Sequence, residues 1–265
     1  MIMSGMMKQQ KLVDKHKFAL EEVPIPEPDG FHVILKVNKC GICGSEAHVV
    51  YDTGDQWPFK DFVPGHEFSG VVVDPGNRTD LKVGDRVVPA ANIGCGTCKL
   101  CRRGLSNICQ TFNLIWGGFG EYAAMDPRSI FLLPDEMSFT QAAIIEPVAV
   151  GTRAVARARI ENGETVLVLG SGIIGSVCAK LARNNGATVG MQEINMDRAK
   201  AALERGDCDM IFNALDEDVV DQMKAATGGK GWDKIIECSG AKSSYNGALD
   251  VLRMGGTVIM VGAGN

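Results

Sequence analysis

Over the first 150 residues, short apolar runs alternate with polar stretches rich in Gly, Pro and Asp. Runs of this length, bounded by turn-forming residues, are typical of short strands. The pattern therefore predicts a small, mostly β, partly open barrel. A helix is predicted to follow it, because Ser138 and Gln141 have the spacing of a capping box that opens a helix running toward Glu146. The strands are predicted at 31–37, 71–73 and 86–88.

Near residue 150 the pattern changes to apolar runs that alternate with longer helical segments. Gly186 and Gly206 are predicted to end two of these helices. The alternation predicts a right-handed parallel α/β sheet, so we expect two domains, 1–150 and 151–265. Gly190 falls inside a predicted strand, where the missing side chain is expected to lose packing. The strands are predicted at 165–169, 188–191, 209–212, 234–237 and 257–261.

The first strand of this sheet leads directly into a glycine-rich turn and then a helix. Gly170 would allow a tight turn, Gly172 would let backbone N–H groups approach a pyrophosphate, and Gly175 would permit close packing of helix on strand. Ile173 and Ile174 complete the turn as candidate cofactor contacts. This order predicts a Rossmann dinucleotide-binding site, and the alternative is a turn that uses glycine only for packing.

An acidic residue, Glu193, ends the second predicted strand of the sheet. A carboxylate at this position can bind the ribose hydroxyls of the cofactor and would repel a 2′-phosphate, so NAD is favoured over NADP. Arg198 is a further candidate cofactor-binding residue and tempers the exclusion of NADP. Its alternative role is to neutralise the start of the helix near Asp197.

Four cysteines with the spacing Cys95-x2-Cys98-x2-Cys101-x7-Cys109 lie in a polar, turn-rich segment. Four thiolates at this spacing can surround one tetrahedral ion and leave no open position, which predicts a structural zinc lobe over 94–110. An iron–sulfur cluster is the alternative. The ferredoxin pattern, however, places its fourth cysteine three residues after the third and before proline.

A second set of metal-type ligands comes from Cys43 and from the adjacent pair His66 and Glu67. Thiolate, imidazole and carboxylate together form an open zinc site that leaves a position for water or substrate. A core histidine is the simpler interpretation of His66 alone. Cys40 and Cys43 could instead form half of a zinc knuckle, although no second free pair exists outside the four-cysteine segment.

Composition narrows the class of protein. The chain has 265 residues, of which 45% are hydrophobic, so a core is easily buried. A net charge of −5 and a pI near 5.5, with both signs interspersed, offer no basic face for nucleic acid or anionic lipid. The longest apolar run is too short and too glycine-rich to span a bilayer. Because the charge offers no basic face, we expect a small-molecule partner. Nine cysteines without an apolar leader predict a reducing compartment, the cytoplasm.

Taken in order, these motifs resemble the zinc-containing medium-chain alcohol dehydrogenase family. Five motifs in one order are more specific than any one of them. Glu146-Pro147, at a position often held by cysteine, is similar to the sorbitol/polyol and L-threonine dehydrogenase branch. The motifs are Cys-Gly-x-Cys-Gly-Ser-Glu-x-His at 40–48, Gly-His-Glu at 65–67, Gly-Asp-Arg-Val at 84–87, the four-cysteine segment and the glycine turn.

The resemblance implies a GroES-like catalytic domain followed by a Rossmann NAD-binding domain, in a homo-oligomeric enzyme. It implies two zinc ions per chain, one structural and one catalytic. Cys43 and His66 would bind the catalytic zinc, with Glu67 and Glu146 supplying or exchanging a carboxylate contact. The implied reaction is hydride transfer between NAD and a secondary alcohol, such as a polyol, a sugar alcohol or a hydroxy-amino acid.

Three further residues receive roles from the same resemblance. Ser45 and His48 would relay the substrate proton outward. Glu46 stands where an aspartate is usual and is expected to reach His66 as an acceptor that fixes the imidazole tautomer.

The family's parallel sheet has the strand order 3-2-1-4-5-6, and the fifth predicted strand is the last one in this chain. The sixth strand and the segment that completes the catalytic domain would be absent, so we expect a fragment of a longer protein. A naturally shortened member and pairing through the open sheet edge are the alternatives. The rival function is a catalytically silent, truncated zinc- and nucleotide-binding remnant.

Overall fold

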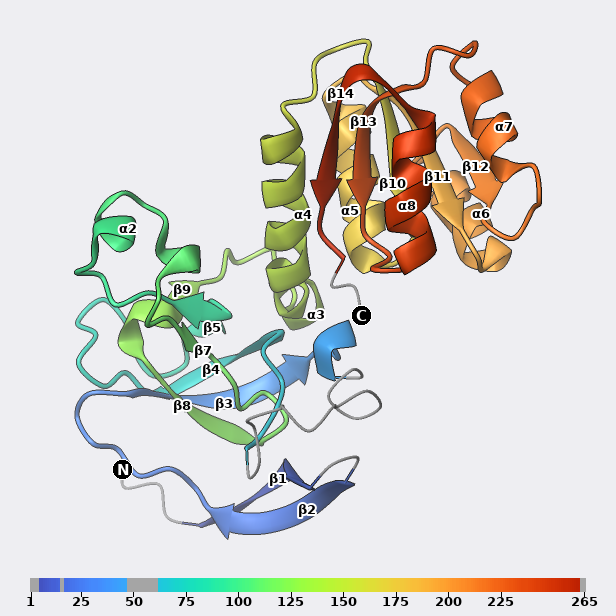
Figure 1. Cartoon of the computed structure of the whole chain (residues 1–265). Helices are drawn as coiled ribbons and strands as arrows, with labels where there is room; N and C mark the ends of the chain where they lie inside the picture. The colour runs from blue at the N-terminus through green and yellow to red at the C-terminus, as the bar shows by residue number, and fades with distance from the viewer. Residues whose placement is uncertain (1–4, 15–16, 47–61, 263–265) are drawn as a thin grey trace. The chain divides into compact units, whose positions relative to one another are not determined.

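The computed structural model describes residues 5–14, 17–46 and 62–262. The chain divides into two compact units, Met1–Glu146 and Pro147–Asn265 (Figure 1). The division falls within helix α4 (Ile145–Ala158). None of the helices in the described ranges has the length and apolar character that a membrane span requires.

The N-terminal unit contains a five-stranded antiparallel sheet with the order β8-β3-β4-β5-β9. The three strands predicted for this region are confirmed as β3, β4 and β5, and the other two are additional. The strands are β3 (Val33–Cys40), β4 (Phe68–Asp74), β5 (Arg86–Pro89), β8 (Tyr122–Met125) and β9 (Ile130–Leu132).

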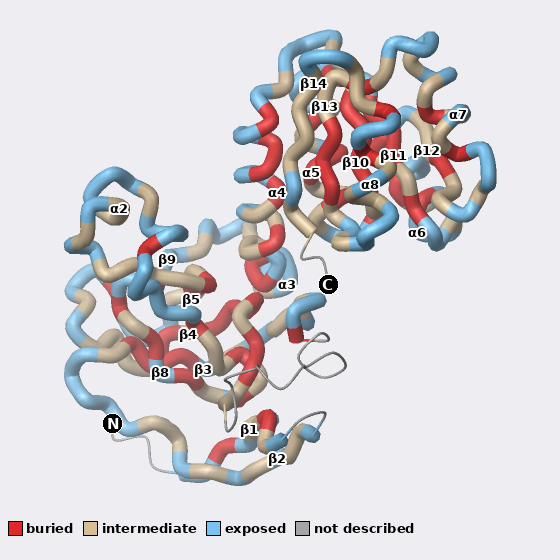
Figure 2. Tube along the Cα trace, viewed as in Figure 1, coloured by how far each residue is buried: buried red, intermediate tan, exposed pale blue. Residues whose placement is uncertain are grey.

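The core of this unit is formed by buried residues of the five-stranded sheet, which are drawn as buried tube segments in Figure 2. Val33, Leu35, Phe68, Val72 and Val87 are fully buried in one hydrophobic cluster. The first three residues of β3, Val33, Ile34 and Leu35, are all buried, so both faces of the strand are covered there.

Two antiparallel ribbons were not predicted from the sequence. One joins β1 (Met6–Asp14) to β2 (Lys17–Pro24), whose Lys, Gln and Glu side chains lack the apolar signal of a core strand. The other joins β6 (Asn92–Ile93) to β7 (Asn113–Leu114) and flanks the four-cysteine segment. Short helices lie in and near this segment: α2 (Lys99–Arg102), η1 (Ser106–Ile108) and η2 (Pro127–Ser129).

The predicted capping box is confirmed at the start of α3 (Phe139–Ala143). The Ser138 hydroxyl accepts from the Gln141 N–H, and the Gln141 side chain accepts from the Ser138 N–H. The helix ends before Glu146, because Ile144 interrupts it, and α4 then begins at Ile145.

The C-terminal unit is a five-stranded parallel sheet with the order β12-β11-β10-β13-β14. This order confirms the prediction 3-2-1-4-5 for the five strands. The strands are β10 (Thr165–Leu169), β11 (Thr188–Glu193), β12 (Met210–Asn213), β13 (Trp232–Glu237) and β14 (Leu252–Met260). The helices that connect them are α5 (Ile173–Asn184), α6 (Met196–Glu204), α7 (Val219–Ala225) and α8 (Lys242–Val251).

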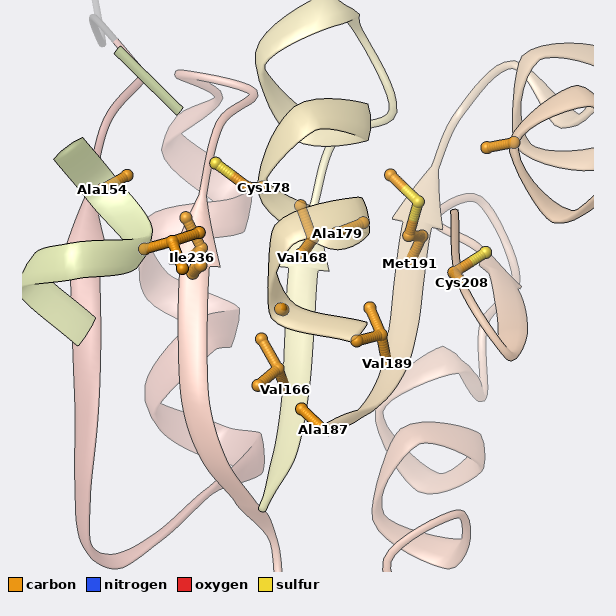
Figure 3. Packing of buried hydrophobic residues seen from close by; sticks show 13 residues of the cluster. Ala154, Val166, Val168, Cys178, Ala179, Ala187, Val189, Met191, Cys208 and Ile236 are labelled. Atoms are coloured by element: carbon orange, nitrogen blue, oxygen red, sulfur yellow. The ribbon is translucent and has the colours of Figure 1, made fainter. Parts of the chain in front are cut away.

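Both faces of this sheet are covered, as a parallel sheet requires. On β10, Val166 and Val168 belong to one hydrophobic cluster, whereas Leu167 and Leu169 belong to another. Figure 3 shows the first cluster, which contains Cys178 of α5 together with Val168 and Ile236. Gly186 and Gly206 follow the ends of α5 and α6 with positive φ, which confirms their predicted role as helix terminators.

Gly190 corrects one expectation from the sequence. A Cβ at this position would lie 2.6 Å from Cη2 of Trp232 and 2.9 Å from Cε2 of Phe212. The space above the glycine is therefore filled by two aromatic rings, which form an edge-to-face pair with centroids 6.1 Å apart. The missing side chain accommodates Trp232 and does not weaken the strand.

We predict that Gly190→Ala lowers the free energy of unfolding by about 1–3 kcal/mol, because the added methyl group overpacks a buried aromatic contact. Urea or thermal unfolding measures this change. Gly247→Ala is the matched control, since this helical glycine has open space around it and alanine is the better helix former. Equal stability of Gly190→Ala and the natural protein would contradict the prediction.

Candidate functional site

The first group of candidate ligands is assembled by two adjacent strands of the N-terminal unit. β3 ends at Cys40, which pairs with Phe68 at the start of antiparallel β4. Cys43 lies just after β3, and His66 and Glu67 lie just before β4. The pairing therefore brings both loops together, and one ligand atom from each of the three side chains lies within 4.8 Å of the others.

A buried carboxylate, Glu46, joins the two loops. Its Oε2 accepts a hydrogen bond of 2.6 Å from the Cys43 N–H, and its Oε1 accepts one of 2.9 Å from the Gly65 N–H. Oε1 also lies 3.1 Å from Nδ1 of His66. The expected proximity of Glu46 to His66 is confirmed, and the backbone contacts add a bracing role that the sequence did not predict.

The His66 ring is held in a buried setting. Its plane is almost perpendicular to that of Trp116, with ring centroids 5.0 Å apart. Within the described ranges, Nδ1 of His66 is the one buried side-chain nitrogen or oxygen atom without an aligned hydrogen-bond partner. An imidazole left in this state beside a thiol and a carboxyl group has the donor set of an open zinc site, so the residues fit this metal.

Burial and nearby charge shift the pKa values of these groups. Burial is the largest influence on Glu67 and raises the pKa of its carboxyl group. Burial opposes protonation of His66, but contacts with Cys43 and Glu46 outweigh it and raise the His66 pKa to about 10. Burial, with the charges of Glu46 and Glu67, raises the pKa of Cys40 to about 12. A divalent cation would displace such protons as it binds.

The other residues predicted for this site are placed differently. Glu146 does not belong to the group within 4.8 Å. It lies at the start of α4, where burial raises the pKa of its carboxyl group and the charges of His66 and Glu67 also act on it. Ser45 is exposed. His48 lies outside the described residues.

The four cysteines of the second group also converge. Sγ of Cys95 lies 3.9 Å from Sγ of Cys101, and Sγ of Cys98 lies 3.9 Å from Sγ of Cys109. Tetrahedral zinc with bonds of about 2.3 Å places its sulfur ligands about 3.8 Å apart, whereas a disulfide would bring two sulfurs to about 2.05 Å. All nine cysteines of the chain are free.

Backbone N–H groups surround these sulfur atoms. The N–H groups of Cys98 and Cys101 donate to Sγ of Cys95 and Cys98 at 3.3 and 3.4 Å, and the N–H of Cys95 donates to Sγ of Cys109 at 3.4 Å. A side-chain hydrogen bond from Thr97, followed by backbone hydrogen bonds, lowers the pKa of Cys95 to about 5. These donors favour the thiolate of Cys95, which is the form that binds a metal. At Cys101 a backbone contact with Gly96 acts in the same direction, but burial and the neighbouring sulfur atoms outweigh it and raise the Cys101 pKa to about 12.

The glycine turn has the geometry that its sequence predicts. Gly170 has φ of 98°, which favours glycine. A Cβ on Gly175 would lie 2.0 Å from the carbonyl oxygen of Gly170, so helix α5 can approach the strand only with glycine there. Gly172 faces open space.

A cavity of about 500 Å³ lies at the carboxyl ends of the parallel strands. Gly170, Gly172, Glu193 and Arg198 line it, whereas Ile173, Ile174 and Gly175 do not. A ligand pocket at this edge is the rule for open α/β sheets. The turn therefore reaches the cavity through its first two glycines.

Part of the lining was missed in the sequence. Val219, Val220 and Met223 of α7 form an apolar wall, and Ser239 and Ser243 follow β13. The sequence could have indicated these residues, because the segments that follow the strands of a parallel sheet meet at the same edge.

Glu193 does not have a free carboxylate at this cavity. Its Oε2 accepts from the N–H and the hydroxyl of Ser171 at 2.7 and 2.9 Å, and its Oε1 accepts from the N–H groups of Ile194 and Asn195 at 3.0 and 3.1 Å. Nη1 of Arg198 lies 3.6 Å from Oε2. Burial acts against ionisation, but these contacts outweigh it and lower the pKa of Glu193.

Comparison with known proteins gives consistent similarities for both units. Residues 29–135 match the alcohol dehydrogenase GroES-like domain, and residues 174–265 match the zinc-binding dehydrogenase family. The chain is 32% identical to sorbitol dehydrogenase of Bacillus subtilis, over 97% of this chain and 75% of that protein. It is 33% identical to L-threonine 3-dehydrogenase of Rhizobium johnstonii, over 98% of this chain and 77% of that protein.

A solved structure of a zinc-binding dehydrogenase from Sinorhizobium meliloti bound to NADP superposes with a TM-score of 0.91 at 31% identity. The match covers 98% of this chain and 78% of the other. The predicted fold class, a GroES-like unit and a Rossmann-type parallel sheet, is confirmed.

We predict that Glu46→Gln lowers the free energy of unfolding by about 1–3 kcal/mol, because the amide offers one acceptor oxygen where two backbone N–H groups, one of them buried, need one each. Urea unfolding measures the change. Glu121→Gln is the matched control, since this carboxylate also accepts a backbone N–H, that of Lys8, but at the protein surface. A loss of the same size in both variants would show that Glu46 has no special bracing role.

Proposed function

Because this chain belongs to the zinc-containing medium-chain alcohol dehydrogenase family, we propose that it transfers a hydride between a secondary alcohol and a nicotinamide dinucleotide. The observation that carries the proposal is the convergence of Cys43, His66 and Glu67 within 4.8 Å. A thiol, an imidazole and a carboxyl group brought together from two loops are a ligand set that an open zinc site can use.

Cys43, His66 and Glu67 would hold the catalytic zinc. Bound zinc would supply a Lewis acid that lowers the pKa of a substrate hydroxyl group. Glu67 is the preferred carboxylate ligand, because it lies in the group with Cys43 and His66 while Glu146 lies outside that group. Gly41 leaves room for the Glu67 side chain, since a Cβ there would lie 2.4 Å from Glu67 Oε2.

The remaining residues near this site would position the substrate and carry its proton. Glu46 would keep both ligand loops in register through its two backbone contacts. Glu146, kept more readily protonated by burial, would hold a proton next to the ligand group. Ser45 lies two residues after Cys43 and is exposed, which suits the start of a proton relay toward solvent. The role of His48 at the end of that relay stays a prediction.

Cys95, Cys98, Cys101 and Cys109 would hold a second, structural zinc. Two of their sulfur separations are 3.9 Å and all four sulfur atoms lie within 4.8 Å of one another, which suits one tetrahedral ion. Four thiolates fill every position of such an ion, so this lobe would carry no chemistry.

The cavity at Gly170 and Gly172 would bind the dinucleotide, with its pyrophosphate at the start of α5 and its adenosine near Glu193. NAD would supply the hydride acceptor. A carboxylate at the adenosine end supports NAD over NADP. Arg198 beside it, and NADP in the relative from Sinorhizobium meliloti, support some tolerance of NADP.

The proposed substrates are polyols, sugar alcohols or hydroxy-amino acids. The names of the relatives, sorbitol dehydrogenase and L-threonine 3-dehydrogenase, support this class. Reduction of NAD and NADP with a panel of polyols, sugar alcohols and threonine tests the proposal on the zinc-loaded protein. No turnover with any member of the panel would favour the silent remnant.

Two further expectations stay predictions. A cytoplasmic location is supported by nine free cysteines, which suit a reducing compartment. A homo-oligomer is expected from the family and is tested by the mass of the protein in solution.

We predict that substitutions in the two ligand groups have different effects on turnover and on stability. Cys43→Ser should remove one zinc per chain and abolish turnover with little change in stability, because its loop is also held by Glu46. Cys98→Ser should remove one zinc and lower the unfolding temperature, since the lobe depends on its ion. Any loss of turnover in this variant should follow from the loss of stability. Metal analysis, thermal unfolding and turnover measure the three effects.

Cys208→Ala is the control for loss of a buried thiol, because Cys208 is buried outside both groups and should leave the zinc content unchanged. Unchanged zinc content and turnover in Cys43→Ser would refute the catalytic assignment.

A further inference from the structure

The hydrogen-bonding capacity of the Glu193 carboxylate is filled by the protein itself. An ionised carboxylate has about four acceptor positions. The N–H groups of Ser171, Ile194 and Asn195 and the hydroxyl of Ser171 occupy them, at 2.7–3.1 Å. An adenosine ribose that donates to Glu193 must therefore displace one of these donors.

The four donors are not equally easy to displace. Three are backbone N–H groups, whose directions are fixed by the glycine turn and by the loop that leads to α6. The hydroxyl of Ser171 is the exception, because rotation about its Cα–Cβ bond turns the donor away without moving the backbone. Ser171 is 2% exposed, so water reaches this hydroxyl poorly and the carboxylate is its main partner.

We propose that Ser171 is a specificity-determining residue, whose hydroxyl competes with the adenosine ribose for Oε2 of Glu193 and so weakens the preference for NAD over NADP. The inference rests on the proposed binding of a dinucleotide at this cavity. Arg198 acts in the same direction, since its Nη1 lies 3.6 Å from Oε2 and its side chain is 54% exposed. This guanidinium offsets the charge that would repel a 2′-phosphate.

The test compares the natural protein with Ser171→Ala, which removes the competing hydroxyl and keeps the Ser171 N–H on Oε2. Calorimetry measures the dissociation constants of NAD and NADP. NAD should bind about three- to tenfold more tightly to the variant, the change expected when one hydrogen-bond competitor is removed. NADP should bind no more tightly than before, so the ratio of the two constants shifts toward NAD.

A second pair of ligands locates the effect at the adenosine end of the cofactor. The ratio of the dissociation constants of 5′-AMP and 2′,5′-ADP should shift in the same direction and by a similar factor. A merely structural role for Ser171 would weaken all four ligands together and would leave both ratios unchanged.

Ser176→Ala is the matched control. Ser176 lies in the first turn of α5, and its hydroxyl donates to the Ser171 carbonyl oxygen at 3.4 Å. This hydroxyl has no hydrogen bond to Glu193. Both ratios should be unchanged in this variant. If Ser171→Ala does not fold, Ser171→Gly removes the same hydroxyl and takes its place.

The outcomes separate this inference from the proposed function. If the natural protein binds both dinucleotides and the ratios are the same in the Ser171 variant, or NAD binds more weakly to it, the role of Ser171 is refuted and the proposed function stands. If the natural protein binds neither dinucleotide, the proposed cofactor site fails and the role of Ser171 fails with it.

Discussion

The antiparallel pairing of β3 with β4 is the constraint on which the first ligand group depends. It joins Cys40 to Phe68 and so fixes the distance between a loop that carries a thiol and a loop that carries an imidazole and a carboxyl group. Glu46 then adds a polar connection between the loops, because one carboxylate oxygen serves each of them. Secondary structure brings the ligands near one another, and a buried charge sets their final positions.

Buried carboxylates that accept hydrogen bonds from backbone N–H groups also occur in the parallel sheet. Glu193 ends β11 and Glu237 ends β13, and each is almost fully buried. Glu237 accepts from the N–H groups of Ser239 and Gly240 at 2.8 and 3.1 Å, much as Glu193 accepts from Ile194 and Asn195. Carboxylates that accept backbone N–H groups shape the loops around both candidate sites. In this chain a buried acid is as much a structural part of a loop as a chemical group.

How well the sequence predicts a feature depends on how far apart in the chain the interacting residues lie. The four-cysteine spacing, the glycine turn and the capping box are local patterns, and the structure has the expected geometry at each. The contact of Glu46 with Gly65 joins residues 19 apart in the chain, and no local spacing pattern predicts it. The packing at Gly190 is not predicted for the same reason, because its neighbour Trp232 comes from another strand. The β1–β2 ribbon is not predicted, because Lys, Gln and Glu residues interrupt the apolar positions of both strands.

The two ligand groups also differ in how they can come into being during folding. The cysteines of the lobe span 14 positions, from Cys95 to Cys109, so closing this loop costs little chain entropy. Cys43 and His66 meet only after β3 and β4 have paired, which is a longer-range event. The lobe can therefore close without the pairing of β3 with β4, whereas the first ligand group cannot form without it. Local opening that separates β3 from β4 would thus disperse the first ligand group and leave the four cysteines together.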